Sequence, residues 1–229
     1  MRPSIQKGFM NELYTLFKKE LVTEWRQRYA LNGILLYVVS TVFVCYLSFN
    51  LQQGKLSVIT WNVLYWIINL FTAVNAIAKS FFQEQYGRQF YYYSIASPQG
   101  IIFAKILYNG LLMVGLTASS YFFYSVVMGN PVQDNLLFLG NLLLAAIGFS
   151  SALTMVSGIA AKASNNVTLM AVLSFPIMLP MLIMLIKVSK NAIDGLTRSS
   201  SYEEIGTLLA IDAIVIALSY LLFPYLWRS

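Results

Sequence analysis

Residues 174–187 read SFPIMLPMLIMLIK, and no charged side chain occurs in this run before Lys187 at its end. A helix of about 20 such residues spans the hydrocarbon core of a bilayer, so the stretch predicts a membrane-crossing helix. Pro176 and Pro180 stand one helical turn apart inside it. Each proline lacks a backbone N–H and crowds the preceding turn, so we expect the helix to kink or unwind there. A packing kink and a moving element are equally consistent with this pair.

Apolar runs of this kind recur along the whole chain. Of its 229 residues, 58% are apolar and only 10% are charged, and the mean hydropathy is +0.67. A soluble domain carries about 25% charged residues, and a soluble helical bundle would show polar stripes that these runs lack. We therefore predict an all-α membrane protein with six transmembrane helices. The expected spans are 31–51, 57–78, 101–128, 135–160, 167–187 and 206–226.

The basic residues are distributed unevenly between the two sides of these spans. Eleven of the 15 Lys and Arg residues fall on the side that holds both termini, and four fall on the other side. Because cytoplasmic segments of membrane proteins concentrate Lys and Arg, we expect both termini in the cytoplasm. Residues 1–30 show no apolar core ahead of a cleavage site, so we expect no signal peptide. The same bias accounts for the net charge of +6 without a nucleic acid partner.

The residue types that support most enzyme and metal chemistry are scarce in this chain. It has no histidine, which removes the commonest metal ligand, the usual general base and a histidine ligand for haem. The single cysteine, Cys45, lies in the first apolar run and excludes an intrachain disulfide. Gly54-Lys55 is followed by Leu56, so the chain has no P-loop for nucleotide hydrolysis. We expect a non-catalytic subunit without a metal site, because an intramembrane enzyme would need converging catalytic groups.

The segment 1–30 differs from the transmembrane domain that we expect over 31–229. Apolar residues recur in this segment three or four positions apart, which places them on one helical face. Phe17, Leu21 and Trp25 belong to this face. We favour an amphipathic helix that lies in the cytoplasmic membrane interface, with Trp25 at headgroup depth. The alternative is a soluble lead-in to the first span.

Polar residues inside the spans are further candidates for function. Asp212 lies in the last span, nearer its outer end. A carboxylate there costs about 2.5–3.5 kcal/mol on insertion scales, so we expect it to face the bundle interior or water. A functional role and snorkelling to the outer interface both stay open for it. Asn69 and Asn75 are expected to bridge helices, and a four-residue spacing of small residues predicts close packing of the fourth span. These small residues are Ala146, Ser150, Thr154 and Gly158.

The sequence QEQYGRQFYYYSIASPQG, residues 83–100, separates the second span from the third. Gly87 permits a turn, and Ser97-Pro98 can begin the next helix because proline suits its first turn. The residues between Gly87 and Ser97 suffice for a short helix on the cytoplasmic surface. Its aromatic residues suit either contact with a partner protein or anchoring at the lipid interface. They are Phe90, Tyr91, Tyr92 and Tyr93.

An N-terminal amphipathic helix, six spans and a structured loop between the second and third spans resemble a type-2 ABC transporter permease. More narrowly, the chain is similar to the haem exporter protein B (CcmB) family of cytochrome c maturation. The resemblance covers nearly the whole chain, and the pair Pro176 and Pro180 is its most specific feature. The other positions that support it are Lys19, Glu20, Leu21, Glu24, Arg26, Phe82, Glu84, Gly87, Ser97, Pro98, Ala104, Lys105 and Pro224.

The resemblance implies a permease subunit of the bacterial inner membrane, with ATP bound and hydrolysed by a separate ABC subunit. It also implies a haem-handling membrane protein and a periplasmic haem chaperone as partners. ATP hydrolysis would help to release the haem-loaded chaperone, and haem is a candidate cargo although this chain itself would hold no cofactor. A second copy of this chain is a further candidate partner beside the lipid bilayer. The alternative is a type-2 ABC exporter permease for another lipid or hydrophobic substrate.

The resemblance also assigns roles to particular residues. A short coupling helix within the loop before the third span would receive the stroke of the ATPase. The residues assigned to this contact are Glu84, Gly87, Arg88, Phe90, Tyr91, Tyr92, Tyr93 and Pro98. Pro176, Pro180 and Asp212 would belong to the moving part or to the substrate path.

Overall fold

The computed structural model describes residues 3–26, 28–51, 56–78, 80–81, 96–163 and 167–228. Over these ranges the chain is helical apart from short connections. Six helices are long and apolar enough to cross a membrane, which confirms the predicted all-α fold and the number of spans. The elements are α1 (Pro3–Arg26), α2 (Arg28–Leu51), α3 (Val58–Ile77), α5 (Pro98–Met128), α6 (Asn135–Ala163), α7 (Val167–Ile193), the 3-10 helix η1 (Arg198–Ser201) and α8 (Tyr202–Arg228).

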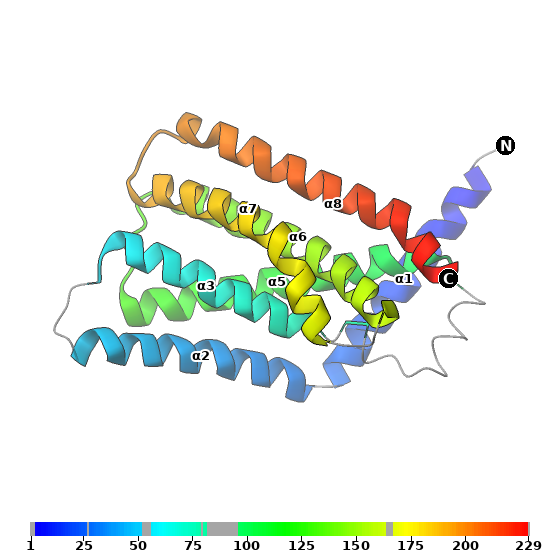
Figure 1. The fold of residues 1–229 in the computed structure, drawn as a ribbon, viewed down its shortest axis with the longest axis horizontal. Helices are drawn as coiled ribbons and strands as arrows, with labels where there is room; N and C mark the ends of the chain where they lie inside the picture. Colours follow the sequence, from blue (N-terminus) through cyan, green and yellow to red (C-terminus); the bar gives the residue numbers. More distant parts are fainter. Residues whose placement is uncertain are drawn as a thin grey trace.

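The six long helices run alongside one another as a bundle, and α1 is set obliquely across one end of it (Figure 1). The end where α1 meets the bundle is referred to below as the α1 end. The opposite end, which holds the connections that follow Met128 and Ile193, is the far end. Helix α1 packs mainly on α5 and also touches α2. The N-terminal helix therefore meets the spans mainly through α5, and Glu12 contacts the N-terminus of that helix.

Helix α6 occupies the centre of the bundle. It packs against α3, α5, α7 and α8, and 67% of its length is buried. Small residues permit this close approach, because an added Cβ at Gly158 would lie 3.0 Å from the Phe223 ring of α8. Ala146, Ser150 and Thr154 are buried along the same helix. The predicted packing role of this stripe of small residues is confirmed.

Helices α7 and α8 extend further than their apolar runs predict. The sequence predicts an end near Lys187, whereas α7 continues to Ile193. The pair of Lys190 and Asp194, with 3.6 Å between Nζ and Oδ2, supports the added turns at solvent-exposed positions. Helix α8 begins at Tyr202, four residues before the predicted start, because two glutamates in its first turn favour a helix N-terminus. The connection between the last two spans is correspondingly short.

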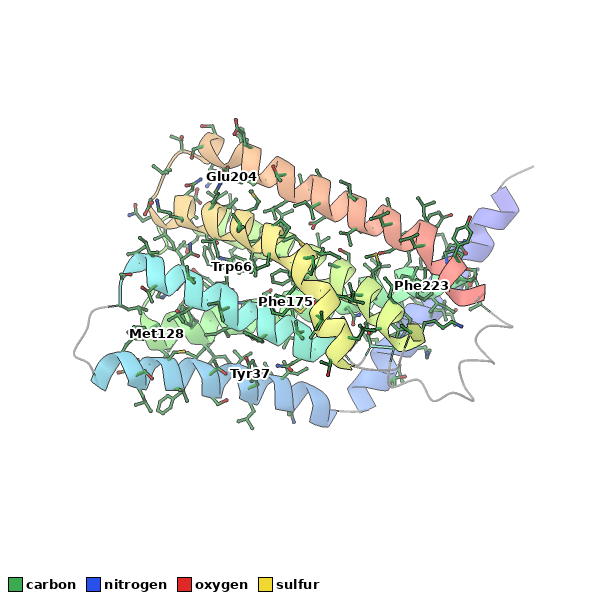
Figure 2. The ribbon with its side chains drawn as sticks, viewed as in Figure 1. Tyr37, Trp66, Met128, Phe175, Glu204 and Phe223 are labelled. Atoms are coloured by element: carbon green, nitrogen blue, oxygen red, sulfur yellow. The ribbon has the colours of Figure 1, made fainter. Side chains whose placement is uncertain are left out.

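A cluster of aromatic rings fills the bundle between α3, α5 and α6, toward the far end. Neighbouring ring centroids lie between 4.8 and 6.1 Å apart. Trp61 Nε1 donates to the carbonyl of Gly129 at 2.9 Å, and the Tyr124 hydroxyl donates to the carbonyl of Trp61 at 2.9 Å. Buried rings whose polar atoms are satisfied in this way fix neighbouring helices firmly. The rings belong to Trp61, Tyr65, Trp66, Tyr121, Tyr124 and Phe138, and Figure 2 labels Trp66 among them.

An ion pair closes the far end by joining the connection before α6 to the connection before α8. Arg198 Nε and Nη2 donate to the two carboxylate oxygens of Asp134 at 2.7 and 3.1 Å. Asp134 Oδ1 also accepts from the backbone N–H groups of Leu136 and Leu137, which caps α6. The hydrogen bond from Arg198, followed by that from Leu137, lowers the pKa of Asp134 to about 2. The backbone N–H of Asp134 further donates to the carbonyl of Ala192 at the end of α7, at 2.9 Å.

Asp134→Asn should lower the midpoint of thermal unfolding in detergent at pH 7, because the amide cannot form the charged pair with Arg198. A carboxylate whose pKa is depressed by folding stabilises the folded state above its ordinary pKa of 3.8. This contribution is lost as the pH falls through about 2. The difference in midpoint between variant and wild type should therefore shrink from about pH 4 to about pH 2.

Glu203→Gln, which changes an exposed acid near the same end, serves as the control and should have a smaller effect at pH 7. A difference for Asp134→Asn that stays constant down to about pH 2 would show that the charge of the carboxylate does not stabilise the fold.

Candidate functional site

Helix α1 contacts the bundle through a face that carries acidic residues. Glu12 and Glu20 lie about two turns apart, and both side chains bond to residues of α5 or its N-cap. Between them, Leu16 packs on a small apolar core at the α1 end. Met10 and Tyr14 are exposed at 64% and 65%. The polar face of α1 therefore meets the protein.

The predicted apolar face of α1 is largely turned away from the bundle. Leu21 is exposed and Phe17 is partly buried, and Trp25 lies within the last turns of the helix. This arrangement leaves the apolar side of α1 available to lipid. The depth of α1 in the membrane interface stays a prediction.

The N-terminus of α5 is held by Glu12. Ser97 is the N-cap and Pro98 the first residue of α5, so the helix begins where the sequence predicts. The Glu12 carboxylate accepts from the backbone N–H of Ser97 at 2.5 Å and from its hydroxyl at 2.9 Å, while Ser97 Oγ accepts from the N–H of Gly100 at 3.1 Å. A carboxylate at this position also interacts favourably with the helix dipole. α1 and α5 are thereby joined by directional, charge-assisted hydrogen bonds.

Two turns further along α5, Lys105 is buried with only 2% of its surface exposed. Its ammonium lies 3.3 Å from Glu20 Oε1, donates to the carbonyl of Ser80 at 2.7 Å and sits 4.8 Å from the centre of the Phe81 ring. A charge that is removed from water needs several such partners. Lys105 therefore connects α1, α5 and the residues that follow α3.

Asn109, one turn beyond Lys105, extends this group of contacts to α6. Its Nδ2 lies 3.1 Å from Ser80 Oγ and donates to Thr154 Oγ1 at 2.7 Å. We name Glu20, Ser80, Lys105, Asn109 and Thr154 the Lys105 cluster. Its members come from α1, α5, α6 and the end of α3, so four parts of the chain meet in one buried polar site.

The residues predicted to contact an ATPase lie beside this cluster in the sequence. Glu84, Gly87, Arg88, Phe90, Tyr91, Tyr92 and Tyr93 lie outside the described residues. The residues that flank them are described: Phe81 belongs to the small apolar core at the α1 end and Ala96 packs against it. Phe223 of α8 is part of the same core, and Figure 2 shows it at this end of the bundle. Both ends of the segment are therefore attached to the α1 end.

Helix α7 bends partway along its length (Figure 1), close to Phe175, which is labelled in Figure 2. Pro176 and Pro180 both lie inside α7, which is helical from Val167 to Ile193. The expectation of a kinked helix is thus met without unwinding. Each proline removes one backbone hydrogen bond, and these losses account for the bend.

The far half of α7 is held by side chains of α3 and α6. Asn62 Nδ2 donates to the carbonyl of Ile186 and Asn141 Nδ2 donates to that of Leu185, each at 2.9 Å. Ser189 Oγ accepts from Asn141 Nδ2 and from Trp66 Nε1, at 2.8 and 2.7 Å. These bonds fix the position of α7 beyond its prolines. The other half of α7 borders a mainly apolar pocket of about 50 Å³, lined by Leu70, Phe71, Val74, Ala171, Ser174, Phe175 and Met178.

Asp212 faces the interior of the bundle, as the sequence predicts for a carboxylate in a span. Its side chain is 4% exposed, and neither carboxylate oxygen has a hydrogen-bond partner within the part of the chain that the structure describes. It packs against Gly148 of α6 and Met181 of α7. An added Cβ on Gly148 would collide with both Met181 Cε and Asp212 Oδ1. Asp212 therefore occupies the contact between α6, α7 and α8.

The amide residues that bridge helices are different from those predicted. Asn69 donates to the carbonyl of Tyr65 in its own helix, and Asn75 is exposed. The bridging amides are instead Asn62, Asn109 and Asn141. The sequence offers one signal for the Lys105 cluster, since Lys105 and Asn109 stand four apart and share a face of an apolar helix. Glu12 and Glu20 are eight residues, or about two turns, apart in α1 and also share a helical face.

Three or more His, Cys, Asp or Glu side chains do not gather anywhere in the described ranges. That haem is a cargo, and that this chain holds no cofactor of its own, stay predictions. The arrangement as a whole suits mechanical transmission between helices.

Six apolar helices in one bundle, with a bent span and a polar junction at one end, define a multi-pass α-helical membrane protein. Comparison with protein families matches the family described as CcmB protein over residues 11–225. This range covers most of the chain, and the chain belongs to the CcmB family, whose members are ABC-type permeases of haem export and cytochrome c biogenesis. Comparisons with curated proteins and with solved structures gave no match.

Gly148→Ala should lower the thermal unfolding midpoint of the purified protein. The new methyl group would overlap Met181 Cε and lie 2.5 Å from Asp212 Oδ1. Gly140 on the same helix has nothing within 4 Å of an added Cβ. Gly140→Ala should therefore stabilise the fold by about 0.5–1 kcal/mol, the usual gain when alanine replaces glycine in a helix.

Scanning calorimetry of both variants in detergent measures these opposite signs. If Gly148→Ala unfolded at the same temperature as Gly140→Ala, the close packing of Asp212 and Met181 on α6 would be wrong.

Proposed function

We propose that this chain is the permease subunit that converts ATP hydrolysis by a separate ATPase into movement of its transmembrane bundle. The movement serves haem handling for cytochrome c maturation and helps to release a haem-loaded periplasmic chaperone. Membership of the CcmB family supports the general role. The sequence has no histidine, and this supports ligation of haem iron by a histidine of a partner protein.

The observation that supports movement most directly is the difference in side-chain hydrogen bonds to neighbouring helices between the two halves of α7, as far as the described residues show it. The far half is hydrogen-bonded to α3 and α6 through Asn62 and Asn141. The other half borders an apolar pocket, and apolar contacts have no fixed direction. Pro176 and Pro180 lie between the two halves, and the backbone hydrogen bonds that they would otherwise donate are already missing. The bend can therefore change at this point without breaking those bonds.

The proposal assigns the α1 end to the cytoplasm, where the excess of basic residues belongs. The ATPase would contact the segment that carries Glu84, Gly87, Arg88 and four aromatic residues. Pro98 would pass this contact to α5 because it is the first residue of that helix. Trp25 would anchor α1 at headgroup depth.

Asp212 belongs to the part that moves under this proposal. Its carboxylate is enclosed by α6 and α7 in the structure, and a different position of α7 would expose it. Carboxylates within spans commonly serve substrate or ion pathways when they reach water. Under this proposal, Asp212 would contact a polar group of the cargo inside the bundle.

Replacing Glu84 and Arg88 together by alanine should weaken recruitment of the ATPase by about tenfold or more, because charged hydrogen bonds contribute strongly at a desolvated contact. Co-purification of the ATPase with the tagged permease measures this loss, and the amount of permease in membranes controls for insertion. Lys162→Ala, which changes an exposed basic residue at the end of α6, is the matched control.

An undiminished complex would show that this segment is not the docking site. Recovery of the ATPase without any haem-handling protein would instead favour export of another lipid or hydrophobic substrate.

Replacing Pro176 and Pro180 together by alanine should straighten α7 and reduce cytochrome c maturation by roughly tenfold, which corresponds to ~1.4 kcal/mol in an activation free energy. Alanine restores two helical hydrogen bonds, so the variant should fold at least as well as wild type. Pro131→Ala, in the connection before α6, controls for proline removal outside the bend. Haem staining of mature cytochrome c measures the outcome. Normal maturation would show that the bend serves helix packing and is not needed for function.

A further inference from the structure

We propose that the ion pair between Glu20 and Lys105 is a releasable link that transmits movement of α1 to α5 and α6. This inference rests on the proposed ATPase coupling and names the residues through which it reaches the bundle. It concerns helix α1, which the assignment of coupling to segment 83–98 leaves without a mechanical role.

Helix α1 is attached to the bundle mainly by polar contacts. Its exposed residues Met10 and Tyr14 lie on the side away from α5, and Leu16 is its contribution to the small apolar core at the α1 end. Glu12 and Glu20 provide bonds of defined length and direction. Apolar surfaces slide past one another easily, whereas hydrogen-bonded charges move together or separate. A displacement of α1 therefore acts on α5 through these two glutamates.

The Glu20–Lys105 pair can open without leaving either charge isolated. Glu20 Oε1 lies 3.2 Å from Lys19 Nζ as well as 3.3 Å from Lys105 Nζ. Lys105 has two further contacts that do not involve Glu20: it donates to the carbonyl of Ser80 and lies over the Phe81 ring. A buried charge that loses its only partner is strongly destabilised, and here both charges keep another partner. Opening of the pair would therefore give a second arrangement in which each charge keeps a partner, and a switch requires two such arrangements.

The contacts beyond Lys105 lead into the centre of the bundle. Ser80, whose carbonyl binds Lys105, also has its hydroxyl 3.1 Å from Asn109 Nδ2. Asn109 donates in turn to Thr154 of α6 at 2.7 Å. Ser80 lies three residues before the segment 83–98 that is assigned to the ATPase. Pressure on that segment and movement of α1 would therefore act on the same cluster. Helix α6 then contacts α7 and α8.

The test uses the complete complex of permease and ATPase. Lys105→Met keeps the length of the side chain but removes its charge. We expect the complex to assemble and to hydrolyse ATP within about twofold of wild type, while cytochrome c maturation falls by about tenfold or more, a typical range for a coupling free energy. Lys162→Met, at an exposed lysine of the same end of the bundle, should match wild type in all three measurements.

A second variant separates transmission from simple stabilisation. In Lys105→Met, Glu20 loses one cationic partner and keeps Lys19. The further change Glu20→Gln removes the remaining charge of the pair, so any fall in the unfolding temperature should be reversed toward the wild-type value. Maturation should stay low if the pair transmits movement. If maturation recovers together with the unfolding temperature, the pair only stabilises the fold and the inference is wrong.

Two further results complete the test. If Lys105→Met does not accumulate, Glu20→Ala replaces it, since Lys105 keeps its contacts with Ser80 and Phe81 in that variant; full maturation in Glu20→Ala would also overturn the inference. Failure of the wild-type permease to bind any ATPase would refute the proposed function itself. That outcome is distinct from a complex that assembles normally and matures cytochrome c normally without the ion pair.

Discussion

The interior of a membrane offers no water, so each polar group there needs a partner within the protein. Backbone groups of the helices satisfy one another, and side-chain hydrogen bonds between helices are therefore few and decisive. Asn62 and Asn141 hold one half of α7, and Asn109 ties α5 to α6. Apolar packing brings the spans together, but these amides fix how each helix is rotated and how far it can slide. The distribution of polar contacts consequently decides which parts of the bundle are rigid.

The two ends of the bundle differ in this respect. At the far end, Asp134 joins Arg198 and the end of α7, and a cluster of six aromatic rings fills the space between three helices. At the α1 end, the described connections are the Lys105 cluster, the hydrogen bonds of Glu12 and the small apolar core that contains Phe81 and Phe223. Force applied at the α1 end would act on helices that are held at the other end. Under the proposed function, this asymmetry lets the far end serve as the support for the movement.

The fold could be predicted from the sequence because the apolar length of a span is a local property. The bend of α7 could be predicted for the same reason, because a proline removes a hydrogen bond within its own helix. The partners of amides could not be predicted, because they depend on how each helix is rotated against its neighbours: Asn69 turned to its own backbone whereas Asn62 reached α7. The pattern of α1 predicts an apolar face, and Met10, Tyr14 and Leu21 of this face are exposed in the structure. It could not show that the opposite face binds the bundle, because Lys105 lies far away in the sequence.

Helix α6 contacts each of the separate parts of the site. Thr154 accepts the hydrogen bond from Asn109 at the α1 end, Gly148 leaves room for Asp212 in the middle, and Asn141 fixes the far half of α7. These three positions are spaced six or seven residues apart along one helix. Because a helix of this length is stiff, a small displacement at Thr154 must be taken up at the contacts of Gly148 or Asn141. The contact at Asn141 is hydrogen-bonded, whereas the contact at Gly148 consists of packing against Asp212 and Met181. Under the proposed function, the bundle would therefore yield at this packing.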